Sequence, residues 1–166
     1  MEITEDIIVG SIIKQLKDHF GNTYKYYDTL IEEGFIRPSF YVYRVNDIYK
    51  KQYTGSEYRF KNDNYIYVIR YFPTNDRSFD RTGEINSIID DLKEVFEYLE
   101  IVNIIPSEVE VEGEEDTINT QYNHINNIEI NVVDNVLQFQ MEFDLRTVKL
   151  PTVNKVEENI LTEGLK

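Results

Sequence analysis

The sequence predicts an α+β fold, in which an antiparallel or mixed sheet of about four to six strands carries two main helices on one face. Two segments repeat apolar residues at spacings of three and four, as amphipathic helices do. Several others are rich in β-branched and aromatic residues, as strands are. Residues 136–148 alternate so regularly that one face of the sheet is expected to be packed and the other wetted or covered by a partner.

The first helix is predicted over residues 3–20. Thr4 is suited to be its N-cap, two acidic residues follow in the first turn, and Gly21 is suited to end it. The polar and aromatic residues 23–29 predict a short strand. The apolar stripe of the helix consists of Val9, Ile12, Ile13, Leu16 and Phe20.

A fixed loop and a long hairpin are predicted next. Gly34 allows unusual backbone dihedrals, and Pro38 excludes a helix and holds Arg37 extended. Strands are predicted over residues 40–48 and 58–72, with a polar turn around residues 54–56. Both faces of the second strand are largely apolar, which predicts a central place in the sheet, and the proline after it predicts its end.

The second helix has the strongest periodic signal, followed by a strand and then by residues 108–116, which are too acidic to pair along their whole length. Its predicted apolar stripe is Ile85, Ile88, Ile89, Leu92, Val95, Phe96 and Leu99.

The last two strands are predicted over residues 124–133 and 136–148, joined by Asp134-Asn135, a weaker hairpin signal than Asp-Gly. We predict a single domain over residues 1–149 and a polar C-terminal arm or tail over residues 150–166. The residues predicted to face the core from the final strand are Leu137, Phe139, Met141, Phe143 and Leu145.

Composition excludes several classes of protein. The net charge of −14 disfavours a non-specific duplex-DNA binder and an anionic membrane surface. The 166 residues include no cysteine, which rules out disulfides and thiolate metal sites. No aliphatic run approaches the length of a membrane span, so we expect a soluble, intracellular protein.

No motif for catalysis or cofactor binding stands out. The two histidines lack metal-ligand spacing, and the seven glycines form no phosphate-binding cluster, so we expect no metal and no cofactor. Asp76, Asp80 and Glu84 could form a carboxylate site, which leaves a small hydrolase as one alternative. An assembly protein is favoured over an enzyme, and Arg70, on a buried strand, is expected to pair with a carboxylate.

The order of elements, together with several short strings, resembles the tail terminator family of phages and phage-derived contractile particles of Gram-positive bacteria. The resemblance covers about residues 3–161. The strings are Glu32-Glu33-Gly34-Phe35, Pro38-Ser39-Phe40, Tyr58-Arg59-Phe60, Ile69-Arg70-Tyr71-Phe72-Pro73, Leu99-Glu100 at the end of the second helix, and Val136-Leu137-Gln138-Phe139.

The resemblance implies a small subunit that forms a six-fold ring on the last ring of the tail tube. There it would stop tube and sheath polymerisation and present a surface to the neck, or cap a headless bacteriocin-like particle. Implied partners are a second copy, the tube protein, the sheath protein and a neck or connector protein. Assembly would occur in the host cytoplasm, followed by incorporation into the tail. A head–tail connector or neck completion protein is the main alternative.

The residues of interest follow from these strings. The chain is longer than the family pattern between Asn46 and Glu57 and between Glu108 and Asn127, which predicts loops specific to its own partners. We read the motif residues first as structural, with interface contact as the alternative. The motif residues are Gly34, Phe35, Pro38, Ser39, Phe40, Arg70, Tyr71, Phe72 and Pro73, and the loop residues are Tyr53, Tyr58, Glu110, Glu112 and Glu114.

Overall fold

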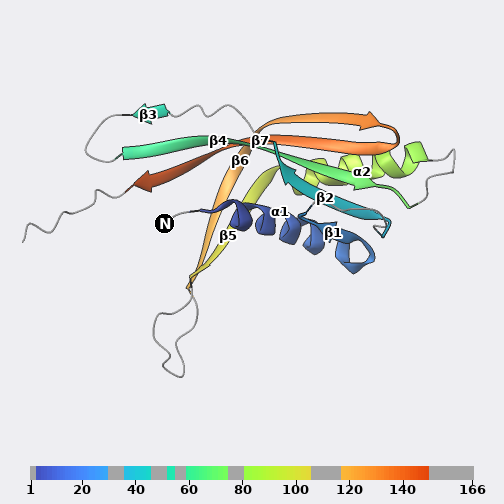
Figure 1. Ribbon diagram of the computed structural model, residues 1–166, viewed down its shortest axis with the longest axis horizontal. Coiled ribbons are helices and arrows are strands. Elements are labelled where there is room, and N and C mark those ends of the chain that lie inside the picture. Colours follow the sequence, from blue (N-terminus) through green and yellow to red (C-terminus); the bar gives the residue numbers. More distant parts are fainter. Residues whose placement is uncertain are drawn as a thin grey trace, which may run out of the picture.

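The computed structural model describes residues 3–29, 36–45, 52–54, 59–74, 81–105 and 117–149. These residues form two α-helices, a 3-10 turn and seven strands, which confirms the α+β prediction (Figure 1). In chain order the elements are α1 (Glu5–Phe20), η1 (Gly21–Thr23), β1 (Lys25–Tyr27), β2 (Ser39–Arg44), β3 (Gln52–Thr54), β4 (Arg59–Phe72), α2 (Arg81–Val95), β5 (Tyr98–Ile105), β6 (Thr117–Val133) and β7 (Val136–Lys149).

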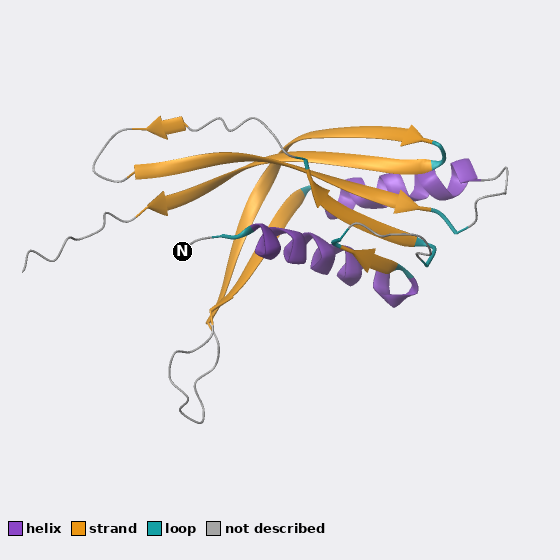
Figure 2. Ribbon diagram, viewed as in Figure 1, coloured by secondary structure: helices purple, strands orange, loops and turns teal. Residues whose placement is uncertain are grey.

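The strands form one mixed sheet in the order β1-β2-β4-β7-β6-β5, with β3 also paired to β4. Among the strand pairs that the structure describes, β1 and β2 are parallel and the others are antiparallel. The sheet is strongly curled, and α1 contacts both β2 near one end of the strand order and β5 at the other (Figure 2). Side chains of both helices join those of one sheet face in a single core, so both helices cover the same face.

The first helix ends at Phe20, as predicted, and begins at Glu5, directly after the predicted N-cap and two residues later than the predicted range. Thr4 is the N-cap, in an extended conformation, although its hydroxyl makes no capping hydrogen bond. Gly21 ends the helix with φ of 72°, a left-handed conformation that glycine adopts without a steric penalty. The buried residues of α1 are Ile8, Ser11, Ile12 and Leu16.

Strands β2 and β4 form the predicted antiparallel pair. Strand β4 lies between β2 and β7, which confirms its predicted central place, and it ends at Phe72, directly before Pro73. The loop around Gly34 and the turn after Thr54 lie outside the described residues.

The predicted end of the second helix is wrong. Helix α2 ends at Val95, the chain turns at Phe96 and Glu97, and Leu99 belongs to β5. Phe96 and Leu99 are both fully buried in the core that the helix also contacts. Because the apolar spacing continues through the turn into the strand, burial periodicity alone cannot mark the boundary.

The β6–β7 hairpin confirms the turn predicted at Asp134-Asn135. Asp134 and Asn135 have φ of 50° and 60°, the positive values that a tight type I′ turn requires. Strand β6 is longer than predicted, beginning at Thr117, and an irregularity between Ile125 and Asn127 divides it. Residues 117–124 pair with β5, and Ile125 and residues 127–133 pair with β7. The ribbon formed by β5 and the first half of β6 swings away from the other strands (Figure 1).

Candidate interaction surfaces

The structure brings the two most distinctive sequence strings together. In the antiparallel register of β2 and β4, Ser39 lies opposite Phe72 and Phe40 lies opposite Tyr71. Alternate residues of each string therefore point to opposite faces of the sheet. One set, which includes Phe40 and Tyr71, enters the core beneath the helices. The other set, which includes Arg70 and Phe72, lies on the face away from the helices, which we call the outer face.

The inner set centres on Phe40, which is fully buried. Its ring centroid lies 4.9 Å from that of Phe20, 5.0 Å from that of Tyr71 and 5.4 Å from that of Tyr24. It also stacks on Tyr26 at 5.8 Å, with an interplanar angle of 12°. This aromatic cluster joins the end of α1, β1, β2 and β4, so these residues stabilise the fold.

Tyr71 connects the cluster to the start of α2. Its hydroxyl donates a hydrogen bond to Glu84 Oε1, which also accepts bonds from the backbone N–H and hydroxyl of Thr74, both at 3.2 Å. Burial, and then the bond to Glu84, raise the pKa of Tyr71 above its ordinary range. Glu84 thus ties the end of β4 to the first turn of α2. Asp76 and Asp80 lie outside the described residues.

The contacts of Arg70 contradict the prediction that it pairs with a carboxylate. Its guanidinium carbon lies 5.1 Å from the ring centroid of Tyr43, which stacks on Tyr41 at 5.1 Å, and among the described residues no carboxylate forms an ion pair with it. Its Nε is buried without a hydrogen-bond partner. Both tyrosines come from β2, so cross-strand stacking takes the place expected for a carboxylate.

The remaining predicted residues are distributed differently. Pro38 is half-buried, Ser39 is buried with no partner for its hydroxyl, and Pro73 is buried. The Arg37 guanidinium carbon lies 5.8 Å from the ring centroid of Phe72. Tyr53 lies in β3, where only the backbone is described. Outside the described residues are Gly34, Phe35, Tyr58, Glu110, Glu112 and Glu114.

Helix α1 covers the edge of β5, a role that the sequence patterns do not predict. Gln15 donates to the carbonyls of Val95 and Tyr98 at 3.0 and 2.9 Å and accepts from the N–H of Glu100 at 3.0 Å. Ser11 accepts from the N–H of Val102 at 3.0 Å. These bonds block an edge that could otherwise pair with another chain. The one signal was two polar residues four positions apart beside the apolar stripe of the helix.

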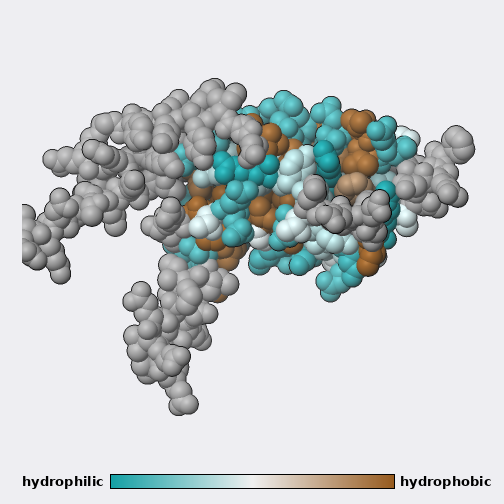
Figure 3. Space-filling model, viewed as in Figure 1, coloured by the Kyte–Doolittle hydropathy of each residue, from teal (hydrophilic) through white to brown (hydrophobic). Residues whose placement is uncertain are grey.

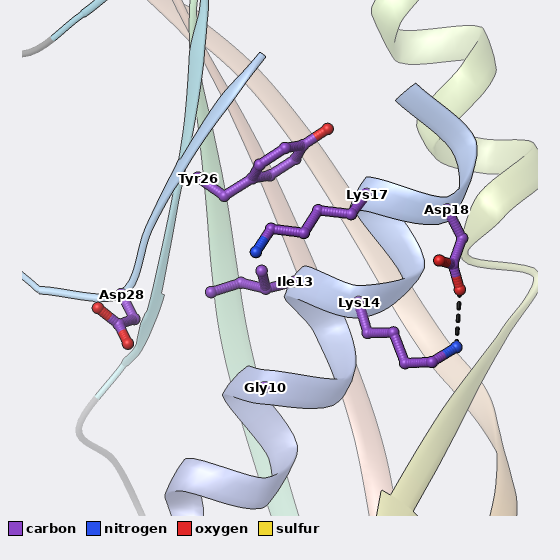
Figure 4. Close-up of a pocket in the computed structure, with 7 residues that line it drawn as sticks. All are labelled: Gly10, Ile13, Lys14, Lys17, Asp18, Tyr26 and Asp28. Carbon is purple, nitrogen blue, oxygen red and sulfur yellow. Dashed lines mark hydrogen bonds and ion pairs between the residues drawn. The ribbon is translucent and has the colours of Figure 1, made fainter. Parts of the chain in front are cut away.

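A groove of about 470 Å³ lies between α1 and β1 (Figure 4). Gly10, Ile13 and Tyr26 are its apolar part. Lys17 reaches toward Tyr26, with its ammonium nitrogen 5.6 Å from the ring centroid, and forms no ion pair in the described part of the chain. The other lining residues are Lys14, Asp18 and Asp28, the first two joined by a 2.7 Å ion pair.

In the described part of the chain, large exposed apolar residues occur at three other places, one of which is Ile36, before β2, at 58%. Val132 and Val133 at the end of β6 are 50% and 51% exposed. On the β5–β6 ribbon, Tyr98 and Tyr122 contact edge to face with ring centroids 5.6 Å apart. On the surface seen in Figure 3, hydrophobic residues form separate patches with hydrophilic ones between them.

The described residues contain no group of three or more acidic or histidine side chains suited to hold a metal ion. Neither described helix has the length and apolar character needed to cross a membrane.

Comparison with known families identifies the chain. The family described as Phage tail terminator protein matches residues 7–155. The chain belongs to the phage tail terminator family. The match runs from α1 beyond the end of β7 and includes both paired strings, so it confirms the family that the sequence resembles. Terminators are structural proteins of the tail. No curated protein matches the chain.

Proposed function

We propose that this terminator forms a hexameric ring on the last ring of the tail tube and stops polymerisation of tube and sheath. The family match over residues 7–155 carries the proposal. The ring then offers its free side to a neck or connector protein, or caps a particle without a head. We further propose that it assembles in the host cytoplasm before it becomes part of the tail, with residues 1–149 as one domain and residues 150–166 as an arm.

The outer face supports a role in protein contact. Tyr41 and Tyr43 present aromatic rings beside the Arg70 guanidinium, and tyrosine and arginine are enriched where proteins bind proteins. The net charge of −14 would repel DNA from the lumen of a ring through which a genome passes.

The decisive experiment is the length of tails made by a producing strain from which the gene has been deleted, measured by negative-stain electron microscopy. We expect tubes and sheaths that are overlong and variable in length. Complementation with the wild-type gene restores one length. Complementation with Lys93→Glu, at an exposed position of α2, serves as a matched control and restores it equally.

Other outcomes would point to other functions. Tails of normal length without heads or collars would favour a neck completion protein. Intact particles would contradict both assembly functions. In a purified system, adding the protein to polymerising tube subunits should shorten the tubes as its proportion rises, and tubes of unchanged length at excess protein would contradict termination.

A further inference from the structure

Two chemically matched surfaces lie at opposite ends of one row of side chains across the sheet. The register aligns Tyr26 with Phe40, Phe40 with Tyr71, Tyr71 with Leu137 and Leu137 with Val132. Four strand spacings of about 4.8 Å separate Tyr26 from Val132, about 19 Å along the sheet. Tyr26 lines the groove between α1 and β1, and Val132 belongs to the tip of the β6–β7 hairpin.

The hairpin tip, residues 132–135, is an exposed projection. It presents two half-exposed valines, then Asp134 and Asn135 in the tight turn, both exposed. Strand β6 pairs with β7 on one side here, and β5 pairs only with the part of β6 before Ile125, so among the described strands the other edge of β6 has no partner. An unpaired edge with exposed valines is a surface suited to contact another chain.

The groove provides the complementary chemistry. Gly10 leaves it open, since a Cβ added there would meet nothing within 4 Å. The Ile13 and Tyr26 side chains are apolar surfaces suited to valines, and the Lys17 ammonium, which lacks an ion pair among the described residues, suits the Asp134 carboxylate. Asp28, on the opposite wall in Figure 4, suits the donor amide of Asn135.

We propose that the hairpin tip of one copy occupies the α1–β1 groove of the next copy. The two surfaces differ and lie at opposite ends of the sheet, so the contact is heterologous, the type that closes into a ring when the rotation between copies permits. The contrast with β5 supports this choice of edge, because α1 already occupies the backbone groups of β5 through Ser11 and Gln15. This inference rests on the proposed function, because it assigns the contact between neighbouring copies in the proposed ring.

The test uses the absence of cysteine from the chain. Gly10→Cys and Val133→Cys together place one thiol in the groove and one at the tip of every copy. Mild oxidation of the purified protein, and of isolated tails carrying the variant, should then give a ladder of disulfide-linked species extending beyond the dimer on non-reducing gels. The ladder should collapse on reduction. Each single variant should stop at the dimer.

Strand β6 itself offers a matched control. Ile118 is also an exposed aliphatic residue of β6, at 67%, but lies at the other end of the strand. Gly10→Cys with Ile118→Cys should give no ladder. Equal ladders from the two pairs would overturn the proposal, because they would reflect random collision.

A mixing experiment tests the head-to-tail arrangement. Gly10→Phe fills the groove and Val133→Asp charges the tip, at exposed positions where neither is expected to unfold the chain. Each variant alone should be monomeric by light scattering. An equimolar mixture should form dimers and nothing larger, since it restores one intact contact. Rings formed by either variant alone would overturn the proposal.

Failure of the contact and failure of the function are distinguishable. Wild-type rings and tails of normal length, without a ladder from the Gly10→Cys and Val133→Cys pair, would overturn the contact and leave termination standing. Tails of normal length after gene deletion would overturn termination itself.

Discussion

The two faces of strand β4 make different kinds of contact, although their residues alternate along the strand. On the inner face Tyr67, Ile69 and Tyr71 are fully buried among residues of the helices and of neighbouring strands. On the outer face Arg70 is only partly covered, and an aromatic ring is its contact instead of a carboxylate. The side chains of the inner face therefore pack within the chain, whereas the outer face keeps a cation that a partner can still neutralise.

This difference explains why short strings can identify a family without themselves being the binding site. Phe40 and Tyr71 meet in the core, so a change in either affects folding before it affects assembly. Tyr43 and Arg70 meet on the outer face, outside the buried core. One segment thus supplies both part of the buried core and part of the outer face.

The largest effect is expected from Phe40→Ala. It removes the central ring of the buried cluster, and truncations of this kind cost about 3–5 kcal/mol. Chemical denaturation would measure the free energy of unfolding. Tyr43→Ala, its counterpart on the outer face, should cost less than about 1.5 kcal/mol. Equal losses from the two variants would remove the distinction between the faces.

The second-largest effect is expected from the loss of one tyrosine hydroxyl on the inner face of β4, where two tyrosines can be compared. Tyr71→Phe removes the hydroxyl that donates to Glu84 and should lower the free energy of unfolding by about 1.5–3 kcal/mol. Tyr67→Phe removes a buried hydroxyl without a hydrogen-bond partner, so the free energy of unfolding should stay within about 0.5 kcal/mol or rise. Thermal denaturation of both variants would measure this. A larger loss from Tyr67→Phe would contradict the hydrogen-bond assignment.

Alkaline pH should weaken the inner face. Burial, with Tyr24 adding a smaller contribution, raises the pKa of Tyr26 to about 12, above its ordinary value near 10. The folded state then holds a proton that the unfolded state releases, so this stabilisation is complete below pH 10 and is lost as the pH rises toward 12. Melting temperatures across this range should fall less steeply for Tyr26→Phe. An unchanged slope of melting temperature against pH would show that Tyr26 does not contribute to the loss of stability at alkaline pH.

The smallest effect on stability is expected from Arg70→Met. The substitution keeps an apolar stem and removes a partly covered guanidinium whose described contact is the Tyr43 ring, worth about 0.5–2 kcal/mol according to how far it is desolvated. Denaturant unfolding would measure the change, with Arg70→Lys as the variant that keeps the charge. A loss above about 3 kcal/mol would indicate a buried ionic partner for Arg70.

Local patterns predicted most of the elements. The alternation of residues 137–145 placed the core face of β7 correctly, and Pro73 and Asp134-Asn135 marked the end of β4 and the final turn. The end of α2 was not predictable in this way, because Phe96 and Leu99 are buried in the same core on either side of the helix boundary. The site was predicted less well: the strings were recognised, but the groove and the hairpin tip were not.

By itself the sequence determined the α+β class, the faces of the strands and the family, because these depend on residue spacing and on short strings. Which residues meet follows from the folded arrangement alone: Phe40 meets Tyr71, Arg70 meets Tyr43, and Gln15 meets the edge of β5. Such contacts join residues far apart in the chain through strand register and the curl of the sheet. Local periodicity carries no information about either.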